Sequence, residues 1–282
     1  VAGYASPAVV TTDITRVIVA DNNGVVRAYD PDSAGAGPAW SVDVGANTSK
    51  ASPLIGRNGL VYVLEDGATT ADRRHAISLT TGGLLWTRIL GAGPGTSSPM
   101  YWDNGSGDDV VFVGADKLYA VNATTGAIVG SSIVLTGQVA SAPTRISNTV
   151  YVLTTSAKLY GFLGTSFTGA ATNIAAFVSN TTLTGAVGSA SLATNNTDII
   201  FFAVGNKLYK IGSGLPAGTP TSVTLGTLAT NFTNATPLLD SGNFVFIGGA
   251  DGRLYRVNGA TMAPIVDDWN AVNFTGWPKR IG

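Results

Sequence analysis

The stretch Ser97–Gly126, SSPMYWDNGSGDDVVFVGADKLYAVNATTG, predicts three consecutive β-strands joined by short turns. It begins with a Ser-Pro segment, continues with the apolar, β-branched run Val110–Gly114, and then alternates over Lys117–Val121 before a Thr-Gly turn. β-branched and aromatic residues favour strands, whereas Gly and Asn between them favour tight turns. Because five other segments follow the same plan, this stretch defines the unit from which the chain is built.

Two landmarks open each unit. The first is an Ala/Ser/Thr-rich segment that ends in proline in five of six copies, with spacings of 46, 46, 44, 48 and 46 residues. The second is an apolar run, found at Val17–Ala20, Leu60–Leu64, Val110–Val113, Val150–Leu153, Ile199–Ala203 and Phe244–Ile247. Unbroken apolar runs of this length are typical of strands that are covered on both faces.

Two further landmarks close the unit. One is a cationic-apolar-aromatic triplet such as Lys117-Leu118-Tyr119, which the first unit changes to Arg27-Ala28-Tyr29 and the second to Arg73-Arg74-His75. Because alternate residues of a strand share a face, we interpret the triplet as a lysine stem lying along a packed tyrosine, in preference to an RNA-stacking surface. The other is a turn followed by a last strand that carries Trp40, Trp86 or Trp277.

Four short strands in a unit of about 46 residues, without a helical pattern, are the signature of a β-propeller blade. We therefore predict an all-β fold, a six-bladed β-propeller with four antiparallel strands per blade and a ring closed by the two termini. The whole chain, 1–282, is predicted to be one domain. Its approximate units are 5–50, 51–96, 97–140, 141–188, 189–234, and 235–282 together with 1–4.

Composition limits the function. Only 12% of the residues are charged and the net charge is -1, which leaves no electrostatic footprint for nucleic acid. The chain has no cysteine, so disulfides and cysteine-built metal sites are excluded. No apolar run approaches the roughly 20 residues of a membrane-spanning helix. Because the sequence begins at Val1 without Met, we expect any export signal to have been removed.

Eight Asn-x-Ser/Thr acceptors indicate an extracellular or cell-envelope (periplasmic or cell-surface) protein, and we take them as glycosylation candidates. They begin at Asn47, Asn104, Asn122, Asn180, Asn195, Asn231, Asn234 and Asn273. The alternative stays open that these loops are simply rich in Asn and Thr.

The combined pattern of Ser-Pro segment, VYV-like strand, KLYAVNATTG and LLW resembles the PQQ-like, or quinoprotein-type, propeller repeat. That family includes quinoprotein dehydrogenases, an outer-membrane assembly lipoprotein and many secreted propellers. The resemblance implies that Trp40, Trp86 and Trp277 pack between blades. It also implies a fold without fixing a function. Quinoprotein enzymes need a Ca²⁺ site, a catalytic Asp and usually a vicinal disulfide. No position here matches these features, so we assign no catalytic residue and do not expect PQQ as a cofactor.

The best metal candidate is the loop Asp103–Asp109, sequence DNGSGDD. Oxygen side chains separated by glycines can wrap Ca²⁺, which takes six to eight oxygen ligands in irregular geometry. The loop resembles the calcium loop of FG-GAP propeller repeats, although it is about one residue shorter and has Ser where that family has Asp. The candidate ligands are Asp103, Asn104, Ser106, Asp108 and Asp109. The alternative is an acidic turn without a metal.

Three residues of the second unit are candidates for a general acid, a general base or a metal ligand. His75 is the only histidine and stands in the tyrosine slot of the triplet, so we expect it to pack in or beside the core. Glu65 and Asp66 could form an acid/base pair, but adjacent residues point to opposite faces of a strand. We expect both carboxylates to lie at a solvated turn.

The sequence as a whole favours a secreted or envelope-exposed, non-catalytic propeller. Its rigid blades would present polar loops to a protein or carbohydrate partner, or to copies of itself. Two alternatives stay open: an enzyme (quinoprotein oxidoreductase, hydrolase or lyase) with its site at the central channel, and a Ca²⁺-stabilised lectin-like module.

Overall fold

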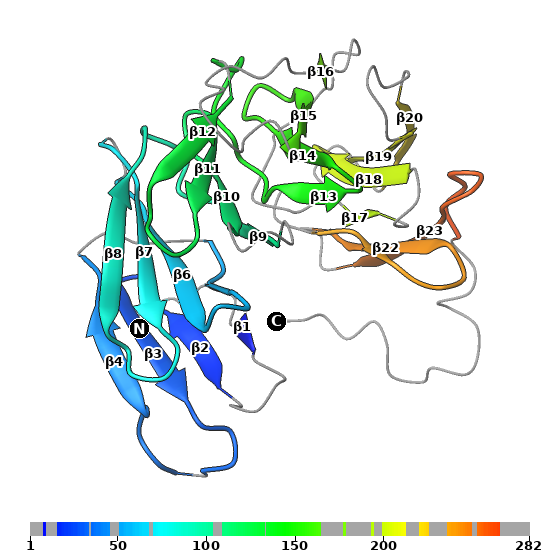
Figure 1. Ribbon diagram of the computed structural model, residues 1–282. Helices are drawn as coiled ribbons and strands as arrows, with labels where there is room; N and C mark the ends of the chain where they lie inside the picture. Colours follow the sequence, from blue (N-terminus) through cyan, green and yellow to red (C-terminus); the bar gives the residue numbers. More distant parts are fainter. Residues whose placement is uncertain are drawn as a thin grey trace.

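Six antiparallel β-sheets follow one another along an arc in chain order (Figure 1). The computed structural model describes residues 8–9, 16–33, 35–45, 51–67, 70–103, 109–132, 134–164, 177–178, 193–194, 199–212, 220–225, 236–249 and 253–265. Within these ranges the regular structure consists of strands, and no α-helix occurs. The prediction of an all-β fold is confirmed.

The strands of the first three sheets are short and consecutive. The first sheet contains β1 (Ala8–Val9), β2 (Val17–Ala20), β3 (Val25–Tyr29) and β4 (Trp40–Asp43). The second contains β5 (Leu54–Ile55), β6 (Leu60–Glu65), β7 (Arg73–Ser78) and β8 (Leu84–Ile89). The third contains β9 (Met100–Trp102), β10 (Val110–Gly114), β11 (Leu118–Asn122) and β12 (Ile128–Ser131).

The last three sheets repeat the plan. The fourth contains β13 (Thr144–Ile146), β14 (Thr149–Leu153), β15 (Leu159–Leu163) and β16 (Phe177–Val178). The fifth contains β17 (Ala193–Thr194), β18 (Ile199–Val204), β19 (Lys207–Gly212) and β20 (Thr221–Thr224). The sixth contains β21 (Leu238–Leu239), β22 (Phe244–Gly248) and β23 (Leu254–Asn258).

Each apolar run predicted from the sequence is the second strand of its sheet, and each triplet lies on or at the start of the third strand. In the third sheet Val110 pairs with Asn122 and Gly114 with Leu118, so the two landmarks form one hairpin. Lys117 Nζ lies 5.4 Å from the centre of the Tyr119 ring, which confirms the interpretation of the triplet at this position.

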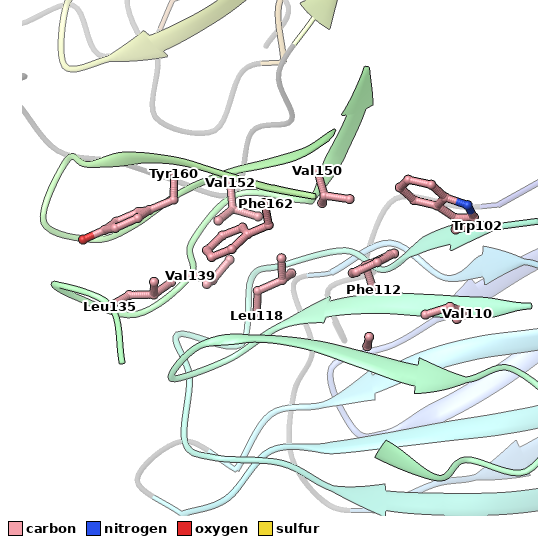
Figure 2. Close-up of a cluster of buried hydrophobic side chains, with 11 residues drawn as sticks. Trp102, Val110, Phe112, Leu118, Leu135, Val139, Val150, Val152, Tyr160 and Phe162 are labelled. Atoms are coloured by element: carbon pink, nitrogen blue, oxygen red, sulfur yellow. The ribbon is translucent and has the colours of Figure 1, made fainter. Parts of the chain in front are cut away.

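Successive sheets pack face to face through five clusters of buried apolar side chains. Figure 2 shows the cluster between the third and fourth sheets, where Phe112 and Leu118 meet Val152 and Phe162. Burying one such side chain stabilises a fold by about 1.5–3 kcal/mol. A single sheet of four short strands cannot bury both its faces, so each sheet depends on its neighbours.

The two end sheets differ from the inner ones. Strands β6 and β10 are buried along their whole length, whereas β2 and β22 alternate between buried and partly exposed residues. For β2 and β22 the prediction of burial on both faces depends on closure of the ring, because each end sheet packs against one neighbour in the described clusters. On the free face of the sixth sheet Leu238 is 67% exposed. Closure of the ring stays a prediction, since residues 1–7 and 266–282, with Trp277, lie outside the described residues.

The small-residue segments link consecutive sheets along the inner strands. The Ser52 amide donates to Ser98 Oγ at 2.8 Å, and Ser97 Oγ donates to the Ser141 carbonyl at 2.9 Å. The partners are 46 and 44 residues apart, close to one repeat. Small side chains at these positions allow the backbones of neighbouring sheets to approach each other.

The tryptophans link the sheets along the outer strands. Trp40 Nε1 donates to the Leu79 carbonyl at 2.8 Å, and Trp86 Nε1 donates to the Ala123 carbonyl at 3.2 Å, in each case on the following sheet. Each indole also packs on a glycine with positive φ, where a Cβ atom would come within 2.6–2.8 Å of the ring. The predicted packing of Trp40 and Trp86 between blades is confirmed.

Candidate functional site

Because consecutive strands of each sheet run antiparallel, the loops lie alternately at the two ends of the sheet. The hairpins between second and third strands, and the connections from one sheet to the next, lie at one end, which we call the connection end. The remaining hairpins lie at the opposite end, which we call the turn end. The candidate calcium loop is at the turn end of the third sheet, between β9 and β10. A cluster of charged residues lies at the connection end of the second and third sheets.

Two of the five predicted calcium ligands are described, and each contacts a protein donor. Arg57 Nη1 lies 2.7 Å from Asp103 Oδ2 at the exposed turn end. The Tyr101 hydroxyl donates to Asp109, and burial together with this hydrogen bond raises the pKa of Tyr101. Asn104, Ser106 and Asp108 lie outside the described residues. Among those that are described, no group of three or more His, Asp or Glu side chains could hold a metal ion.

Of the eight predicted glycosylation candidates, only Asn122 is described. Its Oδ1 accepts hydrogen bonds from the amides of Thr124 at 3.0 Å and Thr125 at 2.8 Å, which closes the turn after β11. Asn258 makes the same turn after β23 without an acceptor sequence. The turn thus explains an Asn at this place without a glycan. Asn47, Asn104, Asn180, Asn195, Asn231, Asn234 and Asn273 lie outside the described residues.

A chain of hydrogen bonds crosses three strands of the second sheet. Glu65 Oε2 lies 2.9 Å from His75 Nε2, and His75 Nδ1 lies 2.9 Å from Thr87 Oγ1. Glu65 Oε1 accepts from Arg73 Nη1 at 2.8 Å. The prediction of a solvated Glu65 is wrong, because it is the last residue of β6 and is 5% exposed beneath Gly45 of the first sheet. The expected core position of His75 is confirmed, since it is 3% exposed.

The hydrogen-bond partners of His75 determine which of its two ring nitrogens carries the hydrogen. A carboxylate paired with Arg73 can only accept, so His75 Nε2 carries the hydrogen and donates to Glu65. In the neutral imidazole Nδ1 then accepts, and the Thr87 hydroxyl donates to it. Burial lowers the pKa of His75, although Glu65 opposes the change, so the neutral form is favoured at pH 7.

Asp72 and Arg74 lie on the other side of the second sheet, facing the third. Arg74 is fully buried in a slot where four other units have leucine and the first has alanine, and its Nη2 donates to the Ser97 carbonyl at 2.5 Å. Asp72 Oδ1 accepts from the Gly67 amide at 3.2 Å. Burial lowers the pKa of Arg74 to about 9 and raises that of Asp72. Arg74 Nε and Nη1 and Asp72 Oδ2 have no hydrogen-bond partner among the described residues.

The connection between these two sheets, Gly91-Ala92-Gly93-Pro94-Gly95, runs along three carboxyl groups. At each glycine an added Cβ atom would lie 2.0–2.7 Å from a carboxyl atom of one aspartate. The pairs are Gly91 with Asp116, Gly93 with Asp72 and Gly95 with Asp66. The Tyr119 hydroxyl accepts from the Gly91 amide at 3.1 Å and donates to Asp116 at 2.8 Å. The constraint is strongest at Gly93, where the backbone of Ala115 also lies 2.7 Å from the Cβ position, whereas the aspartate side chains beside Gly91 and Gly95 can move.

The sequence did not predict that the charged residues of this cluster lie together, although two features of the sequence indicate an unusual site here. The triplet Arg73-Arg74-His75 departs from the Lys-Leu-Tyr pattern at every position, and the GAGPG connection has glycine at alternate positions. Both signals lie in the same unit and meet at the same end of the sheet.

Comparison with known proteins supports the repeat. Residues 72–209 match a family model described as outer membrane protein assembly factor BamB. No curated protein matches the chain. Within the described residues no helix is long and apolar enough to cross a membrane.

Three solved structures share the fold at low sequence identity. BamB from Moraxella catarrhalis is 19% identical with a TM-score of 0.67, and the match covers 89% of this chain and 69% of that chain. The Dos1 propeller is 14% identical with a TM-score of 0.66, over 92% and 68% of the two chains. A quinohemoprotein alcohol dehydrogenase, ADHIIG from Pseudomonas putida HK5, is 15% identical with a TM-score of 0.57, over 88% and 56%.

These likenesses agree with the observed order of the strands and show the fold of a β-propeller. Residues 72–209 carry the repeats that match the PQQ-like family model.

Proposed function

We propose that this propeller is a non-catalytic binding or scaffold module that presents its loops to a protein or carbohydrate partner, or to copies of itself. One observation carries the proposal. In a chain with few charges, Asp66, Arg73, Asp116 and Lys117 gather at the connection end of the second and third sheets, above blades that are locked together by apolar packing. Charged loops on a rigid base suit recognition, because little conformational entropy is lost on binding.

The test is a photo-crosslinking amino acid placed at Asp116, an exposed residue of the connection end. The matched control is the same amino acid at Thr125, which is exposed at the turn end of the same sheet. We expect a discrete adduct with a partner, or with a second copy, from position 116 and none from position 125. Equal labelling from both positions, or none from either, contradicts the proposal.

We also propose that the protein works in the extracellular space or cell envelope. The acceptor sequences and the match to an outer-membrane assembly family support this location. Fractionation of the source cells tests it, and a purely cytosolic distribution contradicts it.

The alternative of an enzyme at the central channel is tested by titration with PQQ and Ca²⁺, since a quinoprotein would show a spectral change.

Calcium at Asp103, Asn104, Ser106, Asp108 and Asp109 stays a proposal. Carboxylate and amide oxygens suit Ca²⁺. Bound Ca²⁺ would raise the melting temperature by mass action, and Arg57→Ala, which frees Asp103 from its ion pair, should increase that effect. An identical melting temperature with Ca²⁺ and with chelator, in both proteins, contradicts the site.

We propose, finally, that the six sheets form a single closed six-bladed ring. The free faces of the first and sixth sheets support this, because both carry apolar residues at positions that are buried in the inner sheets. Since the chain has no native cysteine, Val19→Cys and Phe246→Cys can be combined cleanly. Because packed sheets lie about 10 Å apart, farther than a disulfide reaches, the two thiols are bridged with a bis-maleimide of about that length. A crosslink within one chain is the expected result, and a crosslink only between chains, or none, contradicts closure.

A further inference from the structure

The hydrogen-bonded chain from Glu65 through His75 to Thr87 has a buried and an exposed end. Glu65 and His75 are almost fully buried, whereas Thr87 lies on the outer strand β8 and is exposed. His75 and Thr87 are direct cross-strand neighbours, and Glu65 is diagonal to His75 across β6 and β7. The sheet therefore fixes all three positions through its backbone register.

This order of groups is the arrangement that activates a hydroxyl nucleophile. A hydroxyl donates to a neutral imidazole, and a carboxylate holds the other ring nitrogen and thereby fixes the tautomer. Glu65 is itself fixed by Arg73 at 2.8 Å. A threonine that only stabilises a strand needs no histidine partner: Thr221 on β20, the outer strand of the fifth sheet, lies 3.4 Å from a backbone carbonyl instead.

The side chains around Thr87 favour a reagent that has an aliphatic chain and an electrophilic carbonyl group. Ile89 stands two residues beyond Thr87 on β8 and is 60% exposed, so it offers an aliphatic surface. Arg73 pairs with Ile89 across the strands, two residues along β7 from His75, and its 41% exposed side chain holds Glu65, so a positive charge lies on the same stretch of the sheet.

We propose that Thr87 is a covalent acylation site for activated aliphatic esters. Thr87 Oγ1 attacks the ester carbonyl, and its proton passes to His75 Nδ1. The bond from the carbonyl carbon to the leaving oxygen breaks, and the proton passes from His75 to that oxygen. The products are one O-acyl-Thr87 and one alcohol. The proposal concerns a single acyl transfer, independent of the binding function proposed above and compatible with it.

The probe is p-nitrophenyl butyrate, with release of p-nitrophenolate measured by absorbance and the acyl group located by fragment mass spectrometry. We expect a stoichiometric burst and butyryl on Thr87. Thr87→Val should abolish it, Thr87→Ser should retain it, and Thr221→Val should match the unsubstituted protein. Loss of the base should slow acylation by about 10²-fold or more in His75→Gln, with partial rescue by added imidazole.

Glu65 acts as a positioning residue, and the pH profile tests that role. The carboxylate favours protonated His75, so Glu65→Gln should lower the rate and move its inflection to lower pH. Melting curves of each variant show whether it is folded. The proposal is overturned if Thr87→Val is labelled as fast as the unsubstituted protein, if His75→Gln leaves the rate unchanged, or if no acyl-Thr87 forms.

Discussion

At the scale of single residues, the chemistry of this propeller arises where one unit departs from its own repeat. Four other units place leucine and tyrosine in the second and third positions of the triplet and the first unit places Ala28 and Tyr29 there, whereas the second unit places Arg74 and His75 there. The neighbouring sheets bury these positions in any case. Polar groups in such slots gain from partners within the protein, and His75 contacts Glu65 and Thr87 while Arg74 Nη2 donates to the Ser97 carbonyl.

His75 should make stability depend on pH. Its folded-state pKa is lowered, so below about pH 6.5 the unfolded chain binds a proton that the folded chain does not. Stability is therefore fully present above this range and falls as the pH decreases toward the folded pKa. Denaturation by urea between pH 7.5 and 5 measures the fall.

The matched control for this titration is His75→Gln, which should flatten the dependence. Glu65, Arg73 and Arg74 influence His75 electrostatically and stay in place in the variant, so subtracting its curve isolates the histidine. Asp72, whose pKa is raised, contributes in the opposite sense, because its protonation favours the folded state as the pH falls. Equal slopes for both proteins would contradict the assignment.

The buried pair of Asp72 and Arg74 gives a second prediction. Asp72→Asn removes the carboxylate whose charge favours the charged form of Arg74 and should cost about 1–3 kcal/mol of unfolding free energy. Adding Arg74→Leu, which restores the leucine of units three to six, should recover part of this loss, because an apolar residue needs no partner. Urea unfolding of the two variants is the measurement. A double variant less stable than Asp72→Asn contradicts this view.

The sequence predicted some residues well and others poorly for a physical reason. Trp40 and Trp86 contact the next sheet as expected, because an indole that fills the same slot in every unit can be recognised by its spacing. Glu65 was misplaced because its burial comes from Gly45 of the first sheet, 20 positions away in the chain. The partnership of Glu65, His75 and Thr87 depends on strand register, which alternation alone does not fix.

At the scale of elements, the strands follow from composition, whereas the connections follow from contacts. All six apolar runs form strands, since β-branched runs bounded by turn residues have few other options. The connection Gly91–Gly95 has no such pattern, and its glycines make sense only beside Asp66, Asp72 and Asp116. The structure therefore explains residue choice in the irregular connections, which the sequence pattern alone does not.

A glycine substitution tests this account of the connection. In Gly93→Ala the new Cβ would lie 2.7 Å from both Asp72 Oδ2 and Ala115 Cα, and the backbone atom cannot easily move away. Overpacking of this kind costs about 1–3 kcal/mol. Gly37→Ala is the control, because nothing lies within 4 Å of its Cβ position. We expect thermal unfolding to show a clear loss for Gly93→Ala only, and equal melting temperatures would contradict the close packing.

At the scale of the whole molecule, stability is shared between neighbours. Each inner sheet has a partner on both faces, and contacts in such arrays reach only the adjacent repeat. The sequence predicted the six units and their order, because every unit carries the same landmarks. It also predicted that the two termini close the ring, which stays a prediction.

The free face of the sixth sheet decides between a closed ring and an open arc. Leu238 pairs with Phe246 and shares its face, where Arg256 lies 3.8 Å from the Phe244 ring. If the first sheet covers this face, Leu238→Asp buries a charge and removes about 1.5–3 kcal/mol of apolar burial. Val134→Asp is the matched control, because Val134 is 88% exposed and lies outside the strands of every sheet. Closure predicts that only Leu238→Asp lowers the urea midpoint, whereas an open arc leaves both variants as stable as the parent.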